Sequence, residues 1–570
     1  MSRVVATVLV VLAAAVCFWP AVGGEFLDWD DGYLLTQNPS YRGVDAAHLR
    51  WMFTTFHMGH YHPLTWMSFA LDHAIWGMDP YGYHLTNVVL HAANAALVLA
   101  LALAVFRRAD AAASNRLGAA TLAALLFAVH PLRVESVAWV TERRDVLSAF
   151  FLLLTTIGWL CWTDPAERRR GPCYAFALVC FALSLGAKAV GMTLPAVLLV
   201  LDVWPLRRLD RRARLIVEKL PFAALALVAA ILAFRAQRAS GAMAAAAHLD
   251  VVQRAMQGAY GLAFYVRKSI LPTRLSAAYL LDERLDPRAA RYALSALAVA
   301  GGAMVLLLLR RRWPAGIVAF VCYAILVSPV LGLAQSGIQI VADRYSYLAC
   351  LPLVLLVAAG VGRVPPATPA GRVLAAAALL AVVALGVETR RQVRTWHDSL
   401  SLWDHTIAVD PDNWLAYNVR GTRHEELGDY DRALADFDAS IRRNPSYAAA
   451  YNNRGHAQLG RGDVAAAIDD WTRALAIRPG YADALVNRGG AYLRLSNVSA
   501  GLADLQAAVA ADPGIALGWY NLATAHAMLG DLDAALADVE RTLALTGADP
   551  DLRARAERKR AAILAARAQR

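Results

Sequence analysis

The first 395 residues alternate between long apolar stretches and short polar loops. A stretch of about 17 to 25 apolar residues is long enough to cross a bilayer as a helix. The pattern predicts eleven such spans, at residues 4–22, 84–106, 118–134, 146–163, 173–187, 190–205, 218–236, 290–309, 314–333, 345–362 and 372–388. The first stretch, after Ser2-Arg3, also fits a signal peptide, but its length and the lack of a convincing cleavage site before Glu25 favour an uncleaved span.

The polar loops differ in charge, and this difference predicts how the chain is oriented. Loops rich in arginine face the cytoplasm in membrane proteins. Alternate loops here contain Arg107, Arg108 and Arg116, Arg168–Arg170, Arg207, Arg208, Arg211, Arg212 and Arg214, Arg310–Arg312, and Arg363 and Arg372. We therefore expect a cytoplasmic N-terminus and, after eleven spans, an external C-terminal region. Residues 251–272 are apolar but contain Arg254, Arg267 and Lys268, which predicts an interfacial or re-entrant helix.

After residue 395 the pattern changes to a repeat of 34 residues. Prolines at 411, 445, 479 and 513 and glycines at 421, 455 and 489 keep this spacing. Small residues recur where two helices would touch, and proline would end each second helix. The pattern resembles the tetratricopeptide repeat, a helix–turn–helix unit of the same length. We predict a repeat domain at 396–549, with units at 412–445, 446–479, 480–513 and 514–547, and a basic capping helix at 550–570.

The composition fits an all-α fold in which a membrane bundle precedes an α-solenoid. Of the 570 residues, 58% are hydrophobic and 18% are charged, which excludes an ordinary cytosolic enzyme and a largely disordered chain. The six cysteines lie in or beside apolar stretches without a CxxC pair, which favours core packing over zinc or disulfide roles. The net charge is +11, although residues 396–549 hold 12 basic and 21 acidic side chains. Residues 1–395 hold a net +15 and residues 550–570 a net +5, so most of the positive excess lies in the membrane half, which indicates orientation in a membrane and no nucleic-acid partner.

The first external loop, residues 23–83, carries an acidic pair directly after the first span. Asp30 and Asp31 are costly at a membrane surface unless they are hydrated, paired or functional. They suit a metal ion or the removal of a proton from an acceptor hydroxyl, and the alternative is a solvated loop with a helix cap. In the same loop, residues 64–78 with Trp66, Phe69 and Trp76 predict an interfacial helix. His60 and His62 lack a third ligand, so we assign no metal site there.

Further charged side chains fall in other loops that we predict to be external. Glu135, Arg143, Arg144 and Asp145 follow His130-Pro131, Lys188 lies between two spans, and Asp343-Arg344 precedes another. Ion pairing within one helix, snorkelling of the lysine and a structural Asp–Arg pair are the alternatives. Because all these groups map to one face, we predict a site where Arg143, Arg144, Lys188 and Arg344 hold a lipid-borne phosphate opposite the carboxylates.

Several of these motifs together resemble one protein family. The motifs are the acidic pair, His62-Pro63-Leu64-Thr65-Trp66, the segment from His130-Pro131 to Asp145, Leu199-Val200-Leu201-Asp202-Val203-Trp204-Pro205-Leu206 and Ala342-Asp343-Arg344-Tyr345-Ser346-Tyr347-Leu348. They resemble bacterial relatives of the transmembrane and tetratricopeptide-repeat-containing proteins, whose eukaryotic members are protein O-mannosyltransferases of the GT-C fold. The resemblance implies that Asp30, our first choice, or Asp31 acts as general base. It also implies that Glu135 lines the site and that Arg344 binds phosphate; we add His62 and Asp145 to the substrate-binding candidates.

The resemblance also implies a reaction and its partners. An external site would take its sugar, mannose or another hexose, from a polyprenyl phosphate and transfer it to a hydroxyl such as protein Ser or Thr, with inversion. We expect no obligatory nucleotide, flavin or haem and leave Mg²⁺ or Mn²⁺ open. The repeats, through Asn418, Asn452, Asn487 and Asn521, would bind a protein or peptide acceptor outside the inner membrane. The alternatives are a membrane-anchored scaffold and a transporter, against which the number of spans and the absence of midspan charges argue.

Overall fold

The chain consists of two compact units. The computed structural model describes residues 2–111, 115–167, 170–209, 212–240, 249–282, 285–332, 337–547 and 549–569. The first unit is Met1–His405 and the second is Thr406–Arg570. The boundary lies ten residues after the predicted one because helix α18 (Ser399–Val409) begins in contact with the first unit. The N–H of Asp28 donates to Ser399 Oγ at 2.8 Å, and the rings of Trp29 and Trp403 lie 4.9 Å apart.

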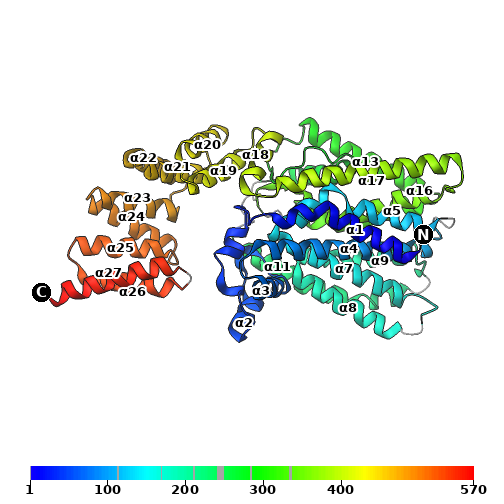
Figure 1. The fold of residues 1–570 in the computed structure, drawn as a ribbon, viewed down its shortest axis with the longest axis horizontal. Coiled ribbons are helices and arrows are strands. Elements are labelled where there is room, and N and C mark those ends of the chain that lie inside the picture. Colours follow the sequence, from blue (N-terminus) through cyan, green and yellow to red (C-terminus); the bar gives the residue numbers. More distant parts are fainter. Residues whose placement is uncertain are drawn as a thin grey trace. The chain divides into compact units, whose positions relative to one another are not determined.

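The first unit is a bundle of helices. The helices are α1 (Arg3–Phe18), α2 (Ala46–Thr54), α3 (Pro63–Trp76), α4 (Pro80–Arg108), α5 (Arg116–Ala128), α6 (Val134–Ala138), α7 (Arg143–Trp162), α8 (Arg170–Ala187), α9 (Leu194–Val203), α10 (Arg212–Val217), α11 (Leu220–Ala239), α12 (Val251–Ile270), α13 (Ala290–Leu309), α14 (Pro314–Val327), α15 (Ser346–Ala349), α16 (Leu351–Gly362) and α17 (Pro369–Thr395). Strands β1 (Tyr279–Leu280) and β2 (Gln339–Val341) pair antiparallel. Helices α1, α4, α7 and α8 lie along one another, with α2 and α3 at one end and the N-terminus at the other (Figure 1).

Most of the predicted spans correspond to helices that are long enough for a membrane. Within the described residues, seven helices are long and apolar enough to cross a bilayer, or up to nine if each of two bent pairs forms one span. The bent pairs, Arg116–Ala128 with Pro131–Ala138 and Asp343–Ala349 with Leu351–Gly362, turn by 56° and 55°. The other two predicted spans, 190–205 and 314–333, are shorter apolar helices, so seven to nine of the expected eleven spans are long and apolar enough within the described residues.

The loop between α1 and α4 folds into a small core of its own. Tyr41, Met52, Trp66, Phe69 and Tyr83 are buried in it. Trp66 and Phe69 therefore do not serve as the interfacial side chains of the helix predicted at 64–78, because both rings pack inward, whereas Trp76 is 38% exposed. Helix α3 instead exposes Met67, Leu71 and Ile75, which recur every four residues and so share one face.

The second unit consists of helix pairs stacked in the manner of tetratricopeptide repeats. The pairs are α19 (Trp414–Glu426) with α20 (Tyr430–Arg443), α21 (Ala448–Arg461) with α22 (Val464–Ile477), α23 (Ala482–Arg494) with α24 (Val498–Ala511), and α25 (Ala516–Met528) with α26 (Leu532–Leu545), followed by α27 (Pro550–Ala568). Arg420, Arg454 and Arg488 each bind an aspartate 16 residues further on, at N···O distances of 2.6 to 2.8 Å. The 34-residue period therefore repeats a polar contact between paired helices as well as an apolar one.

Close contact within the first three pairs involves a glycine, at position 421, 455 or 489. A Cβ on Gly455 would lie 2.9 Å from Trp471 Nε1 and 3.1 Å from the carbonyl oxygen of Ala467. Helix α22 carries both groups, and its backbone cannot yield as a flexible side chain can. The repeated glycine thus sets how closely the two helices of a repeat approach.

We expect Gly455→Val to destabilise the repeat unit. The added methyl groups would force the two helices apart, at a cost of about 1–3 kcal/mol, the range for overpacked cores. Thermal unfolding of the full chain in detergent, followed by circular dichroism, measures the effect. The control is Gly480→Val, because a Cβ at Gly480 meets no atom within 4 Å. Equal melting temperatures for the two variants would contradict this account of the packing.

Candidate active site

A buried carboxylate, Glu142, lies at the centre of a group of charged side chains from distant parts of the sequence. Arg144 Nη2 lies 2.7 Å from Glu142 Oε1, Lys188 Nζ lies 2.9 Å from Glu142 Oε2, and Arg344 Nε lies 3.2 Å from Glu142 Oε1. Lys188 Nζ also lies 2.7 Å from Asp145 Oδ1. We call Glu135, Glu142, Asp145, Arg144, Lys188 and Arg344 the charged cluster. The structure therefore brings together five of the predicted site residues.

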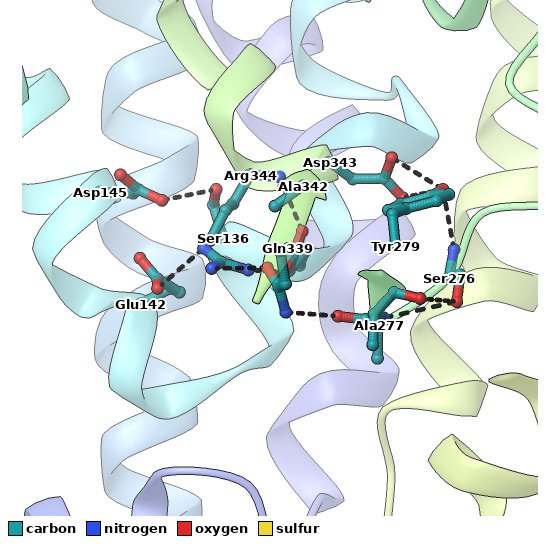
Figure 2. A network of polar contacts seen from close by, with 12 residues as sticks. Ser136, Glu142, Asp145, Ser276, Ala277, Tyr279, Gln339, Ala342, Asp343 and Arg344 are labelled. Atoms are coloured by element: carbon teal, nitrogen blue, oxygen red, sulfur yellow. Dashed lines mark hydrogen bonds and ion pairs between the residues drawn. The ribbon is translucent and has the colours of Figure 1, made fainter. Parts of the chain in front are cut away.

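Arg344 connects the two ends of this cluster. Its backbone N–H donates to Glu135 Oε2 at 2.7 Å, and its guanidinium forms an ion pair with the other oxygen of the same carboxylate. Its Nη2 donates to Gln339 Oε1 at 3.1 Å. Figure 2 shows Glu142 and Asp145 on one side of Arg344, with Asp343 and Tyr279 on the other. The guanidinium is thus held in one orientation by contacts from α6, from β2 and from the turn before α7.

Asp343, which we predicted at the phosphate site, points away from the cluster. Tyr279 Oη donates to its two carboxylate oxygens at 3.1 and 3.2 Å (Figure 2). Burial raises the pKa of Tyr279 well above its usual value, so the hydroxyl keeps its proton and acts as the donor. Asp343 therefore anchors the turn that carries Arg344 to strand β1.

Arg143 also lies outside the cluster, although it neighbours Arg144 in sequence. Its Nη2 lies 2.7 Å from Asp72 Oδ2, and its Nη1 donates to Ser68 Oγ at 2.7 Å. The side chain is fully buried. Successive residues of a helix point about 100° apart, so the first turn of α7 directs one arginine to the loop core and the next to the cluster. Arg143 thus fastens α3 to α7 and is directed away from the cluster.

The two acids of the predicted catalytic pair have different surroundings. Asp31 is fully buried and accepts hydrogen bonds from the N–H of Leu27 at 2.9 Å, the N–H of Thr141 at 3.0 Å and the hydroxyl of Thr141 at 2.5 Å. Burial raises the pKa of Asp31 to about 7, although these donors lower it. The carboxylate therefore connects the loop to the segment before α7, and its oxygens are already occupied.

Asp30 is half-buried, and its side chain makes no hydrogen bond or ion pair with the described residues. Burial raises the pKa of Asp30, while the nearby Arg144 and Arg344 lower it and Glu142 raises it. The carboxylate thus lies close enough to the charged cluster to interact with its guanidinium groups. Of the two acids, only Asp30 has oxygens available to a substrate.

His62 lies in the loop between α1 and α4, near the cluster. It precedes α3, and the Thr65 hydroxyl donates to the carbonyl of Ala187, next to Lys188, at 3.0 Å. The His62 ring lies 4.8 Å from the Trp66 ring and 5.9 Å from the His60 ring. Burial lowers the pKa of both histidines well below the usual value, and Arg144 adds to the shift. Both imidazoles are therefore neutral near pH 7.

An apolar groove leads to the charged cluster from within the bundle. It has a volume of about 430 Å³ and is lined by α4, α7, α9, α14 and α16. Leu152, Leu326 and Leu348 also line a smaller pocket of about 40 Å³ that contains Asp145, Lys188 and Arg344. At its other end the groove is lined by Ala109, Trp313 and Arg363, which adjoin predicted cytoplasmic loops. Helix α14 runs the length of the groove, about 20 Å at 1.5 Å per residue.

Protein groups engage most of the acidic residues of the site. No group of three or more His, Cys, Asp or Glu side chains suited to a metal ion occurs among the described residues. Glu142 and Asp145 face lysine and arginine, and Asp31 accepts hydrogen bonds from the protein. Asp30 is the carboxylate of the site that no protein group among the described residues engages, and Mg²⁺ or Mn²⁺ stays an expectation from the sequence.

The predicted acceptor-binding asparagines lie on the first helices of the repeats, where they also bind one another. Asn453 Nδ2 donates to Asn418 Oδ1 at 3.2 Å, and Asn487 Nδ2 donates to Asn452 Oδ1 at 3.1 Å. Each contact joins one repeat to the next. Asn521 is on α25, with its side chain near Gly490 of the preceding repeat. These amides thus have a structural role in stacking the repeats.

Sequence reasoning missed three features of the site. It did not identify Glu142 as the central carboxylate, Tyr279 as the partner of Asp343, or the groove. Glu142 lies in the run Glu142-Arg143-Arg144-Asp145, and this dense charge beside an apolar span was the available signal. Tyr279 and the groove gave no local signal, because both depend on segments that are distant in sequence.

The chain is similar to known proteins over parts of its length. A tetratricopeptide-repeat family profile matches residues 418–482 and 486–553. Protein O-mannosyl-transferase TMTC2 of Mus musculus is 35% identical over 154 residues, which are 27% of this chain and 18% of that protein. Protein O-mannosyl-transferase TMTC1 of Mus musculus is 30% identical over 220 residues, 35% of this chain and 22% of that protein. A solved tetratricopeptide-repeat protein of Thermus thermophilus covers 32% of this chain and 95% of its own at 23% identity, with a TM-score of 0.26.

These matches are partial. The chain spans about a fifth of the length of the two mouse relatives. The profile match and the paired helices confirm the predicted repeats. The chain is thus a membrane-type helical bundle followed by tetratricopeptide repeats, and it is related to the TMTC protein O-mannosyl-transferases.

Proposed function

We propose that the protein is a membrane glycosyltransferase that moves a sugar, mannose or another hexose, from a polyprenyl phosphate to a hydroxyl group. The observation that carries this proposal is the junction between the apolar groove and the pocket that contains Lys188 and Arg344. A polyprenyl phosphate has the same division, with a long hydrocarbon chain attached to a charged phosphate. The names of the TMTC relatives support the class of reaction.

The charged cluster suits a phosphate leaving group. When the bond between the sugar and the phosphate breaks, negative charge increases on the phosphate oxygens, and fixed cations stabilise that charge. Lys188 Nζ and the Arg344 guanidinium border the polar pocket and are oriented by Glu142, Asp145 and Glu135. Cations held in position by carboxylates need not reorganise during the reaction. The geometry thus supplies a preorganised site for the departing lipid phosphate.

Asp30 acts as the general base in this proposal. The acceptor oxygen attacks C1 of the sugar and its proton passes to the Asp30 carboxylate, while the C1–O bond breaks and its electron pair stays with the phosphate. The products are a glycoside and the lipid phosphate. A single displacement of this kind inverts the configuration at C1. No step requires a cofactor.

The acceptor and the membrane face follow from the same proposal. A lipid-linked donor is needed where nucleotide sugars are absent, so the reaction takes place on the external face of the inner membrane. The acceptor is a Ser or Thr hydroxyl of a protein that the repeats bind as an extended segment. The groove supports this orientation, since its far end adjoins loops rich in arginine, which favour the cytoplasm.

We expect Asp30→Asn to abolish transfer without loss of stability. An amide cannot accept the proton, and general-base catalysis typically contributes about 100- to 10,000-fold to a rate. Release of labelled sugar onto a peptide from undecaprenyl-phosphate mannose measures the activity. Asp31→Asn is the matched comparison. The NH₂ group of the asparagine would face one of the N–H or O–H groups that donate to Asp31. The lost hydrogen bond costs about 1–3 kcal/mol of stability and should lower the melting temperature. Full activity in Asp30→Asn would exclude Asp30 as the base.

We expect Ala359→Phe to impair the use of long-chain donors. Ala359 of α16 lines the groove, so a phenyl ring there would occupy volume that the hydrocarbon chain needs. Transfer from an undecaprenyl-phosphate sugar should fall at least about tenfold, the equivalent of about 1.4 kcal/mol, while a farnesyl-phosphate sugar should be affected less. The control is Val357→Phe, because Val357 is exposed at 58% and does not line the groove. Equal effects of the two substitutions on both donors would argue against a lipid in this groove.

A further inference from the structure

Two sets of residues outside the ion pairs are relevant to a bound donor. Asp145, Lys188 and Arg344 border the small pocket that joins the apolar groove. Asp30, His60 and His62, from the loop between α1 and α4, lie near the same cluster, because Arg144 shifts the pKa of all three side chains. A donor whose phosphate lies at the cluster would therefore have this loop segment within reach of its sugar.

The loop segment is fixed in place from three directions. The amide of Gln237 on α11 donates to the carbonyl of Gly59 at 2.8 Å. The Thr65 hydroxyl binds the turn of Lys188, and the Trp66 ring packs against His62. Trp66 is fully buried and packs against Trp51 and Phe69 as well. The two histidines are thus presented to the cluster by a rigid support.

His62 has a hydrogen-bonding atom that the protein does not use. The side chain is 2% exposed, and its Nε2 is buried with no hydrogen-bond partner among the described residues. A buried nitrogen without a partner costs about 1–3 kcal/mol, so such a group is a candidate to bind a ligand. His60, whose ring lies 5.9 Å from that of His62, is half-buried beside it. Neither histidine forms an ion pair in the described part of the chain, although Arg144, Lys188 and Glu142 are close.

We propose that His60 and His62 form the subsite that binds the hydroxyl groups of the donor sugar. This inference rests on the proposed function and assigns a part of the same site. A neutral imidazole offers one N–H donor and one nitrogen acceptor, which suits the hydroxyls of a sugar ring. A phosphate, by contrast, is held more strongly by the three cations nearby. The histidines therefore distinguish the sugar, whereas Lys188 and Arg344 hold the phosphate.

The test compares two lipids that differ only in the sugar. The full chain in nanodiscs is titrated with undecaprenyl-phosphate mannose and with undecaprenyl phosphate. His62→Phe keeps an aromatic ring against Trp66 but removes both nitrogens, and His60→Ala changes a half-buried position. Each substitution should lower the affinity for the mannose-bearing lipid about five- to tenfold, which corresponds to the loss of one hydrogen bond. The affinity for undecaprenyl phosphate should change less than twofold. Lys188→Gln should lower the affinity for both lipids by the same factor.

The outcomes separate the inference from the proposed function. Retained binding of undecaprenyl phosphate shows that a variant is folded. If His62→Phe binds neither lipid, the result for His60→Ala decides whether the histidines bind the sugar. If the histidine variants lose affinity for both lipids in parallel, or for neither, the assignment of the sugar subsite is wrong while the glycosyltransferase proposal stands. If the unmodified protein binds neither lipid, the proposed function fails and the subsite with it.

Discussion

The ion pairs around Glu142 determine how the site is built. A buried carboxylate loses its hydration, and only close cations and hydrogen bonds compensate for that loss. Arg144, Lys188 and Arg344 provide them from the first turn of α7, the turn after α8 and the turn after β2. Because these three segments are far apart in the sequence, the carboxylate ties the folding of the bundle to the assembly of the site. Removing it would leave three cations close together without their shared partner.

The surroundings change in character on either side of these ion pairs. Toward the interior of the bundle, the cluster opens into a groove lined by aliphatic and aromatic side chains. Toward the loop, it meets the free carboxylate of Asp30 and two neutral histidines. The cluster therefore borders an apolar groove and lies near a free carboxylate and two neutral imidazoles. The donor that we propose, a sugar linked to a polyprenyl phosphate, likewise combines an apolar chain, a charged group and a polar ring.

The periodic patterns predicted most of the fold, because the length of an apolar stretch and a 34-residue repeat are properties of the sequence alone. The site was harder to predict, since it depends on side-chain direction. Arg143 and Arg144 look equivalent in sequence, yet they point in different directions from α7 and bind different partners. The same holds for Asp30 and Asp31, of which Asp31 accepts three protein hydrogen bonds. Trp66 and Phe69 suggested a membrane interface, but the loop has enough aromatic residues to form a core that buries them.

The position of a bound lipid phosphate tests the central claim most directly. A structure of the full chain with undecaprenyl phosphate, determined by electron cryo-microscopy in nanodiscs, would show it. We expect the phosphate within hydrogen-bond distance of Lys188 and Arg344 and the hydrocarbon chain between α14 and α16. A phosphate bound at the opposite end of the groove, beside Trp313 and Arg363, or a chain that lies outside the groove, would contradict the account.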